Sequence, residues 1–150
     1  MVTAVADRVR LNTAESINES IRCATEQNVA RVAQGGHRAI ERRLAALDQE
    51  WDIERYLETV APMLTLTGIT LGLTTNRRWF ALPIVVQTFF LQHALQGWCP
   101  PLPMLRSFGI RTMEEIDEER NALKALRGDY DRVSRHSGQV ADRAVEAARR

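Results

Sequence analysis

The sequence predicts an all-α protein in which a two-helix transmembrane hairpin is flanked by amphipathic and polar helices. Its main support is a block of 47 residues, Thr59 to Leu105, whose only formal charges are Arg77 and Arg78. The other 37 of the 39 charged residues lie in the rest of the chain. Apolar residues at helical spacing flank this block, and glycines and prolines mark where the helices end.

A length of 150 residues allows one domain. The changes in composition divide it into four segments. Polar and amphipathic helices are expected over 1–58 and the hydrophobic hairpin over 59–98. A Cys-Pro-Pro connector with a charged helix follows over 99–128. We expect the polar, alanine-rich residues 129–150 to form a flexible tail or a marginal helix.

Two helices are predicted before the hairpin, over residues 13–33 and 37–58, separated by Gly35 and Gly36. In the second of them, the spacing i, i+4, i+7 and i+11 places four apolar residues on one stripe. These residues are Ile40, Leu44, Leu47 and Trp51. Such a stripe is typical of a packing helix, and a helix lying on a membrane surface is the alternative.

A further helix is predicted after a short connector over residues 105–111. Thr112 to Glu115 form a capping box, and Gly128 marks the end of this helix. Its acidic residues cluster near the N-terminus, where negative charge is favourable. We interpret that cluster as a solvated face. It comprises Glu114, Glu115, Asp117, Glu118 and Glu119.

The hairpin has two uncharged segments joined by a basic turn at residues 76–78. The first, Thr59–Thr75, has 17 residues and would reach about 26 Å as a helix, with Pro62 where a helix can begin. The second, Trp79–Trp98, has 20 residues and would reach about 30 Å, close to the hydrocarbon thickness of a bilayer. The second segment is therefore the stronger candidate span.

Two tryptophans bracket the second segment. Trp79 and Trp98 are separated by the distance between two membrane interfaces, where indole rings prefer to lie. We expect both to act as interface anchors.

The first segment carries a face of small residues. Gly68 and Gly72 form a GxxxG pattern, and Ala61 and Thr65 extend the same face. Small residues let helix backbones approach closely where lipid removes the hydrophobic drive for association. This face is predicted to pack helices and to join two copies of the chain as a homodimer.

The second segment carries a polar stripe. Thr88, Gln92 and Gln96 follow an i, i+4, i+8 spacing, and His93 lies beside them. Each polar side chain needs a hydrogen-bond partner inside lipid, so the stripe is expected to face a partner helix or a second subunit. A soluble four-helix dimer, in which the hairpin is buried against a partner, would also satisfy it.

The end of the hairpin carries a family resemblance. Gly97-Trp98-Cys99-Pro100, within the sequence GWCPPLPMLRSFGIRT, resembles the YgaP-like inner-membrane transmembrane domain family over about residues 55–112. That family has no known function and is sometimes fused to a rhodanese sulfurtransferase, whose domain and catalytic cysteine loop these 150 residues lack. The resemblance implies a membrane-embedded hairpin, often dimeric, with both chain ends on the cytoplasmic side of a bacterial inner membrane.

Cys99 is the one candidate for thiol chemistry. An interfacial thiol at this position would accept sulfane sulfur, sense oxidants or help to bind a metal. The C-terminal end of a helix, however, disfavours a thiolate, and two prolines after Cys99 suit a structural turn. A metal site built from His93, Gln96 and Cys99 would need ligands from a second subunit. The sequence therefore predicts no metal and no cofactor.

The predicted function is a non-enzymatic, membrane-anchored scaffold or self-associating interaction module. No catalytic motif is present, and a net charge of +1 argues against nucleic-acid binding. The expected partners are the lipid bilayer, a second copy of the chain and proteins that contact the flanking helices. Two alternatives stay open: a thiol-dependent accessory in sulfur or redox chemistry through Cys99, and a soluble helical adaptor.

Overall fold

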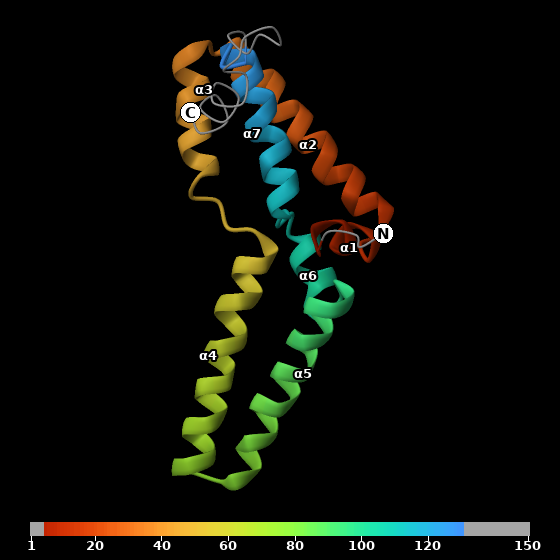
Figure 1. The fold of residues 1–150 in the computed structure, drawn as a ribbon, viewed down its shortest axis with the longest axis vertical. Coiled ribbons are helices and arrows are strands. Elements are labelled where there is room, and N and C mark those ends of the chain that lie inside the picture. The colour runs from red at the N-terminus through yellow and green to blue at the C-terminus, as the bar shows by residue number, and fades with distance from the viewer. Residues whose placement is uncertain (1–4, 131–150) are drawn as a thin grey trace, which may run out of the picture. The chain divides into compact units, whose positions relative to one another are not determined.

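The computed structural model describes residues 5–130, and all the regular structure in that part of the chain is helical (Figure 1). The elements are α1 (Val5–Leu11), α2 (Glu15–Gln34), α3 (His37–Leu47), α4 (Ile53–Thr74), the 3-10 helix η1 (Arg77–Phe80), α5 (Ala81–Gln96), α6 (Leu102–Ser107) and α7 (Met113–Arg127). The all-α prediction is thus confirmed. The predicted tail lies, beyond Tyr130, outside the described residues.

The described residues form two compact units. The first contains residues 5–21 and 51–114, and the second contains residues 22–50 and 115–130. One boundary falls within α2, and another falls in the segment between α3 and α4. The four segments predicted from composition have other boundaries, because composition separates polar from apolar segments and does not report which helices pack together.

The second unit is built on the predicted stripe of α3. Ile40, Leu44 and Leu47 are buried against residues of α7, with Val29 and Val32 of α2 packed beside them. The α7 residues are Ile116 and Leu123. The first three residues of the stripe therefore form a packing face, as predicted, whereas the fourth, Trp51, belongs to the other unit and is exposed.

Charged side chains also lie inside the second unit. Glu119 is fully buried, and its two carboxylate oxygens accept hydrogen bonds from Arg43 Nε at 2.7 Å and Nη2 at 2.9 Å. The hydrogen bond to Glu119 raises the pKa of the Arg43 guanidinium. Glu115 is buried as well. The interpretation of the acidic cluster of α7 as a solvated face is therefore wrong for Glu115 and Glu119, because α7 turns these two positions inward.

The helix predicted over residues 37–58 is two helices. α3 ends at Leu47, and Asp52 starts α4 by accepting a hydrogen bond from the backbone N–H of Arg55 at 2.6 Å. A carboxylate at this capping position satisfies a donor that has no partner within the helix. α4 then runs through Pro62, which was expected at the start of a helix.

Two helices of the first unit were not predicted. α1 lies within residues 1–12, where no individual helix was predicted, and α6 covers part of the expected connector. Both are short, but each buries one apolar side chain completely: Val9 in α1 and Leu102 in α6. Arg106 of α6 is also fully buried and donates hydrogen bonds to the Ile110 carbonyl and to Asn18 Oδ1.

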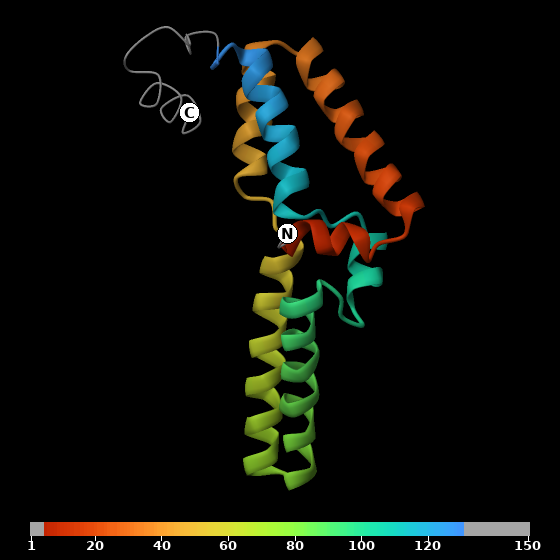
Figure 2. The ribbon, with the colours of Figure 1, turned by 45° about the vertical axis from the view of Figure 1, so that its right-hand side comes forward.

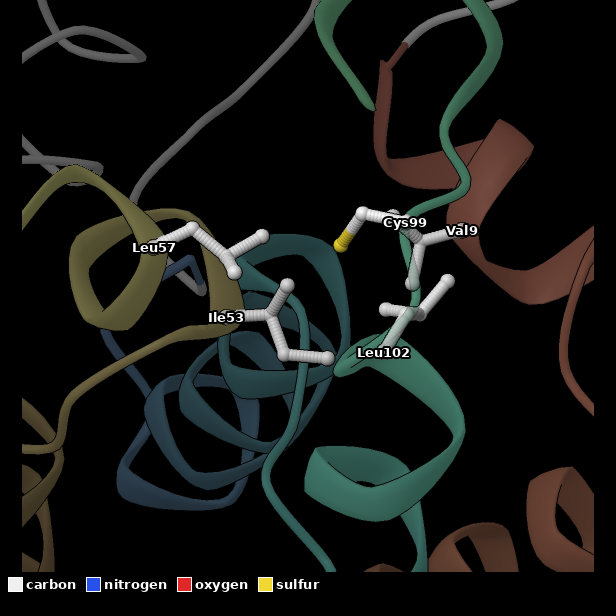
Figure 3. Close-up of a cluster of buried hydrophobic side chains, with 5 residues drawn as sticks. All are labelled: Val9, Ile53, Leu57, Cys99 and Leu102. Carbon is white, nitrogen blue, oxygen red and sulfur yellow. The ribbon is translucent and has the colours of Figure 1, made fainter. Parts of the chain in front are cut away.

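These helices meet in the core of the first unit. The cluster consists of Val9, Ile53, Leu57, Cys99 and Leu102 (Figure 3). It joins four parts of the chain: α1, the start of α4, the segment that follows α5, and also α6. Its position at one end of α4 and α5 makes it the base of the hairpin.

The C-terminus of α5 is held by α1. Arg8 Nη1 donates to the Leu95 carbonyl at 2.8 Å, and Asn12 Nδ2 donates to the Gln96 carbonyl at 3.1 Å. The last carbonyls of a helix lack partners within the helix, and a cation there also complements its dipole. Gly97 follows in the left-handed conformation, with φ of 73°. A Cβ at Gly97 would lie 2.5 Å from Arg8 Cβ.

Replacing Gly97 with alanine is expected to destabilise the first unit more than the same change at Gly109. Both glycines have positive φ, which costs an alanine about 1–2 kcal/mol. A Cβ at Gly109 meets nothing within 4 Å, whereas one at Gly97 displaces α1. Overpacking of this kind adds about 1–3 kcal/mol. Thermal unfolding of the two variants in detergent measures the difference, and equal losses would contradict the close approach of α1.

Candidate functional site: the apolar hairpin and the pocket at its base

α4 and α5 lie side by side and antiparallel, joined by η1 (Figures 1 and 2). Among the described helices, α4 alone is long and apolar enough to cross a membrane, with 22 residues and a length of about 33 Å. Only 22% of its most apolar stretch is buried. α5 has only 16 residues and reaches about 24 Å. The sequence favours the second segment as the span, but in the structure the first helix of the pair, α4, is the longer one.

The hairpin exposes apolar side chains on many sides. Twelve of the 18 large apolar residues that are exposed in the described chain lie between Val60 and Leu95. They are Val60, Met63, Leu64, Leu66, Ile69, Leu73, Trp79, Ile84, Val85, Phe89, Leu91 and Leu95. Soluble monomers rarely expose large apolar surfaces, so these side chains make the hairpin the candidate functional surface.

Several polar side chains of the hairpin form hydrogen bonds within it. The hydroxyls of Thr67, Thr74 and Thr88 each donate to the carbonyl four residues earlier, at 2.7–2.8 Å. Gln87 Nε2 donates to Thr65 Oγ1 at 2.8 Å and so links α5 to α4. These internal bonds lower the cost of placing the side chains in lipid, where water supplies no partner.

The small-residue face packs within one chain. Ala61, Gly68 and Gly72 are buried. A Cβ at Gly68 would lie 2.4 Å from Pro83 Cδ, and one at Gly72 would lie 2.8 Å from the Phe80 ring. Together with Thr65, this face therefore joins α4 to α5 and η1 and is covered by them. The predicted small-residue face is thus covered by the chain's own α5 and η1.

The predicted polar stripe is divided in the structure. Thr88 and Gln96 are exposed, and Gln92 is partly buried. His93, in contrast, is 4% exposed. Adjacent residues of a helix point in different directions, so His93 is turned toward the inside of the hairpin although Gln92 beside it is only partly buried.

The two tryptophans occupy different environments. Trp79 lies in η1 and is 44% exposed, so it is free to contact an interface. Trp98 lies beyond the end of α5 and packs partly buried against the core cluster of Figure 3. The structure thus places Trp98 in the base of the hairpin, against the core cluster.

A pocket of about 190 Å³ opens at this base, between α4, α5 and the Cys-Pro-Pro segment. Its walls are almost entirely apolar. The lining residues are Leu57, Val60, Ala61, Leu64, Val86, Phe89, Phe90, His93, Cys99, Pro100 and Pro101. The sequence drew attention to His93 and Cys99 separately, and the structure brings both into one wall.

Cys99 is 2% exposed, and Figure 3 shows its sulfur directed toward Leu57 and Ile53. Burial raises the pKa of the Cys99 thiol, while the backbone N–H of Leu102 has a smaller effect in the opposite direction. A buried thiol with a raised pKa is a poor nucleophile. The structure therefore favours the structural interpretation of Cys99 over sulfur-transfer or redox chemistry.

Iodoacetamide is expected to alkylate Cys23 faster than Cys99, because Cys23 is partly exposed. Mass spectrometry of alkylated peptides measures this difference, and equal alkylation rates of Cys23 and Cys99 would contradict it.

The stability of the chain should also fall as pH rises past the ordinary pKa of a thiol, because the unfolded chain loses the Cys99 proton before the folded chain does. This loss should be absent in Cys99→Ala. Unfolding at pH 7 and 10 measures this effect, and an equal loss of stability in Cys99→Ala would contradict it.

Within residues 5–130, no three His, Cys, Asp or Glu side chains gather closely enough to hold a metal ion. The chain matches no protein-family model, no curated protein and no solved structure. The resemblance to the YgaP-like family therefore stays a prediction.

Proposed function

We propose that this protein is a non-enzymatic, membrane-anchored interaction module whose α4–α5 hairpin is inserted into a lipid bilayer. The observation that carries the proposal is the surface of the hairpin. It exposes twelve large apolar side chains, while the hydroxyls of Thr65, Thr67, Thr74 and Thr88 and the amide of Gln87 bond internally. That combination matches a helix pair whose solvent is lipid.

The dimensions of the hairpin fit this proposal. The uncharged part of α4, from Thr59 to Thr74, reaches about 24 Å, and α5 also reaches about 24 Å. Both lengths approach the thickness of a hydrocarbon core, about 30 Å. Arg77 and Arg78 are exposed in η1, at the turn. A hairpin that crosses the core would place these two arginines on the far side.

A hairpin returns the chain to the side from which it entered. The flanking helices on both sides of the hairpin would therefore share one compartment. Following the family resemblance, we assign that compartment to the cytoplasm and the membrane to a bacterial inner membrane. The flanking helices would then be available to cytoplasmic protein partners.

Self-association is assigned to the outer face of α5. The small-residue face of α4 is covered, whereas on α5 Gln96 is exposed and Gln92 is partly buried. Side-chain amides can bond across helices within a membrane. Two copies packed through these amides would supply one another with hydrogen bonds. We therefore place the proposed homodimer on α5.

Resistance to carbonate washing tests membrane insertion. The full chain, expressed in bacteria, should stay in the membrane pellet. Leu66→Arg and Leu95→Arg, at hairpin positions that are both 65% exposed, should shift the chain to the soluble or aggregated fraction. Leu126→Arg is the matched control, because Leu126 is 55% exposed but lies in α7. Release of the parent chain by carbonate would overturn the proposal and support a soluble adaptor.

The direction of the hairpin is tested with Asn76→Cys combined with Cys23→Ser. Asn76 is exposed in the turn. A membrane-impermeant maleimide applied to intact spheroplasts should label this cysteine if the flanking helices are cytoplasmic. Labelling only after lysis would reverse the assigned orientation.

A further inference from the structure

Two aromatic rings and a cation lie together at the start of α4, beside the base of the hairpin. The rings of Trp51 and Tyr56 form a T-shaped contact, with their centroids 5.2 Å apart. The Arg55 guanidinium lies over the Trp51 ring, with Cζ 4.5 Å from the ring centroid. We call these three residues the Trp51 cluster. Its contacts hold an indole, a phenol and a guanidinium at one level of α4.

The Trp51 cluster is accessible from outside the first unit. Trp51 is 38% exposed, Arg55 is exposed and Tyr56 is partly buried. Among the described residues, the Arg55 side chain forms no hydrogen bond or ion pair, so its N–H groups can bond an anion. Ile53 and Leu57, on the same turns of α4, are buried in the core of this unit. The cluster is therefore fixed to the hairpin at a defined height.

This height is where the charged part of α4 ends. Glu58 is the last charged residue of the helix. From Tyr56 to the end of α4 at Thr74 the helix rises about 27 Å, close to a hydrocarbon core about 30 Å thick. Trp79, which is 44% exposed, lies in η1 just beyond that end. An exposed tryptophan thus lies beyond each end of the uncharged part of α4.

The chemistry of the Trp51 cluster matches the head-group region of a bilayer. Tryptophan and tyrosine are enriched there because each has an apolar ring and a polar N–H or O–H. A guanidinium bonds phosphate through paired N–H groups. A docked protein would account for the exposed cluster but not for its spacing from Trp79. Trp98, at the same end of the hairpin, is partly buried against the core cluster.

We propose that the Trp51 cluster is an anchor for a phospholipid interface, in which both rings lie where acyl chains meet head groups and Arg55 binds a lipid phosphate. The inference rests on the proposed insertion of the hairpin and names the residues that set its depth. Trp79 then contacts the opposite interface. The residues that hold the base of the hairpin at its interface therefore precede the uncharged block.

Fluorotryptophan labelling tests the depth of all three tryptophans in one sample. The labelled full chain is placed in nanodiscs of phosphatidylethanolamine and phosphatidylglycerol and observed by fluorine NMR. Spectra of Trp51→Phe and Trp79→Phe assign two resonances and leave the third to Trp98. A lipid spin label near the carbonyl end of the acyl chain should broaden the Trp51 and Trp79 resonances strongly. The same label at the methyl end of the chain should broaden both much less.

The phosphate contact is tested through the dipolar coupling between the Trp51 fluorine and lipid phosphorus, measured by solid-state NMR. Lipid phosphorus should dephase the Trp51 signal in the parent chain. The dephasing should be lost in Arg55→Gln and largely kept in Arg55→Lys, which retains the positive charge. Arg42→Gln, at an exposed arginine of α3 in the second unit, is the matched control and should leave the dephasing unchanged.

Failure of the anchor and failure of the proposed function give different spectra. Broadening of Trp79 without broadening of Trp51 would show an inserted hairpin that is anchored elsewhere, and it would overturn the inference alone. No broadening of Trp51 or Trp79 by any lipid label would overturn insertion as well. Equal broadening of Trp51 by the two labels would place it too deep for an interface. Unchanged dephasing in Arg55→Gln would overturn the assignment of phosphate to Arg55.

Discussion

Replacing Gly68 with leucine is expected to separate α4 from α5 and to lower the stability of the hairpin by about 3 kcal/mol. Even a single Cβ at this position would lie 2.4 Å from Pro83 Cδ, and a proline ring cannot rotate away. Overpacking at a close helix contact costs about 1–3 kcal/mol, and the rigid neighbour places this case at the upper end. Thermal unfolding in detergent, with hydrogen exchange to locate the loss in α4 and α5, measures the effect.

Thr70→Leu is the matched control for this change. Thr70 lies two residues from Gly68 on α4, but it is exposed, so the added side chain meets no protein wall. It should leave the unfolding temperature nearly unchanged. If Gly68→Leu dissociated a dimer while the exchange of α4 and α5 amides stayed as slow as before, the glycine face would join two chains, and its assignment to the hairpin interior would fail.

Replacing Arg43 with alanine is expected to destabilise the second unit by about 3–5 kcal/mol. The change removes the guanidinium that donates to both oxygens of the fully buried Glu119 carboxylate, at 2.7 and 2.9 Å. Breaking a buried ion pair from one side typically costs this much, because the remaining charge keeps its desolvation penalty. The protection of α3 and α7 amides against hydrogen exchange should fall roughly a hundredfold or more.

Arg42→Ala controls for the loss of an arginine from α3, because Arg42 is the exposed neighbour of Arg43. Its effect on exchange should be small. The double variant Arg43→Met with Glu119→Leu should recover most of the lost stability, since apolar residues of similar volume often replace buried ion pairs without cost. A double variant as unstable as Arg43→Ala alone would show that the pair itself contributes the stability.

The fold class and the helical hairpin could be predicted from the sequence because both depend on local patterns. Exclusion of charge over 47 residues and the spacing of Ile40, Leu44 and Leu47 report which helices form and which faces they bury. Helix boundaries were less predictable. Asp52 reads as one more charge on an amphipathic face until its hydrogen bond to the Arg55 N–H shows that it begins a helix.

The partner of each face could not be predicted from the sequence. A row of small residues such as Gly68 and Gly72 fits a neighbouring helix equally well within a chain or between chains. The buried position of Glu119 was also hidden, since a carboxylate is exposed by default unless a distant arginine pairs with it. The pocket combines residues from α4, α5 and the segment after them, and local spacing alone does not reveal such a combination.

The hydrogen bond between the Ile53 N–H and the Arg111 carbonyl, at 3.0 Å, ties the beginning of α4 to the residues just before α7. Residues 53 to 111 therefore leave and rejoin the rest of the chain at nearly the same point. A segment with adjoining ends can be excised and the gap closed by a short turn. Here, however, excision would also remove the core partners of Val9 and the α5 carbonyls that Arg8 and Asn12 bond, so the hairpin and α1 depend on each other although they are far apart in the sequence.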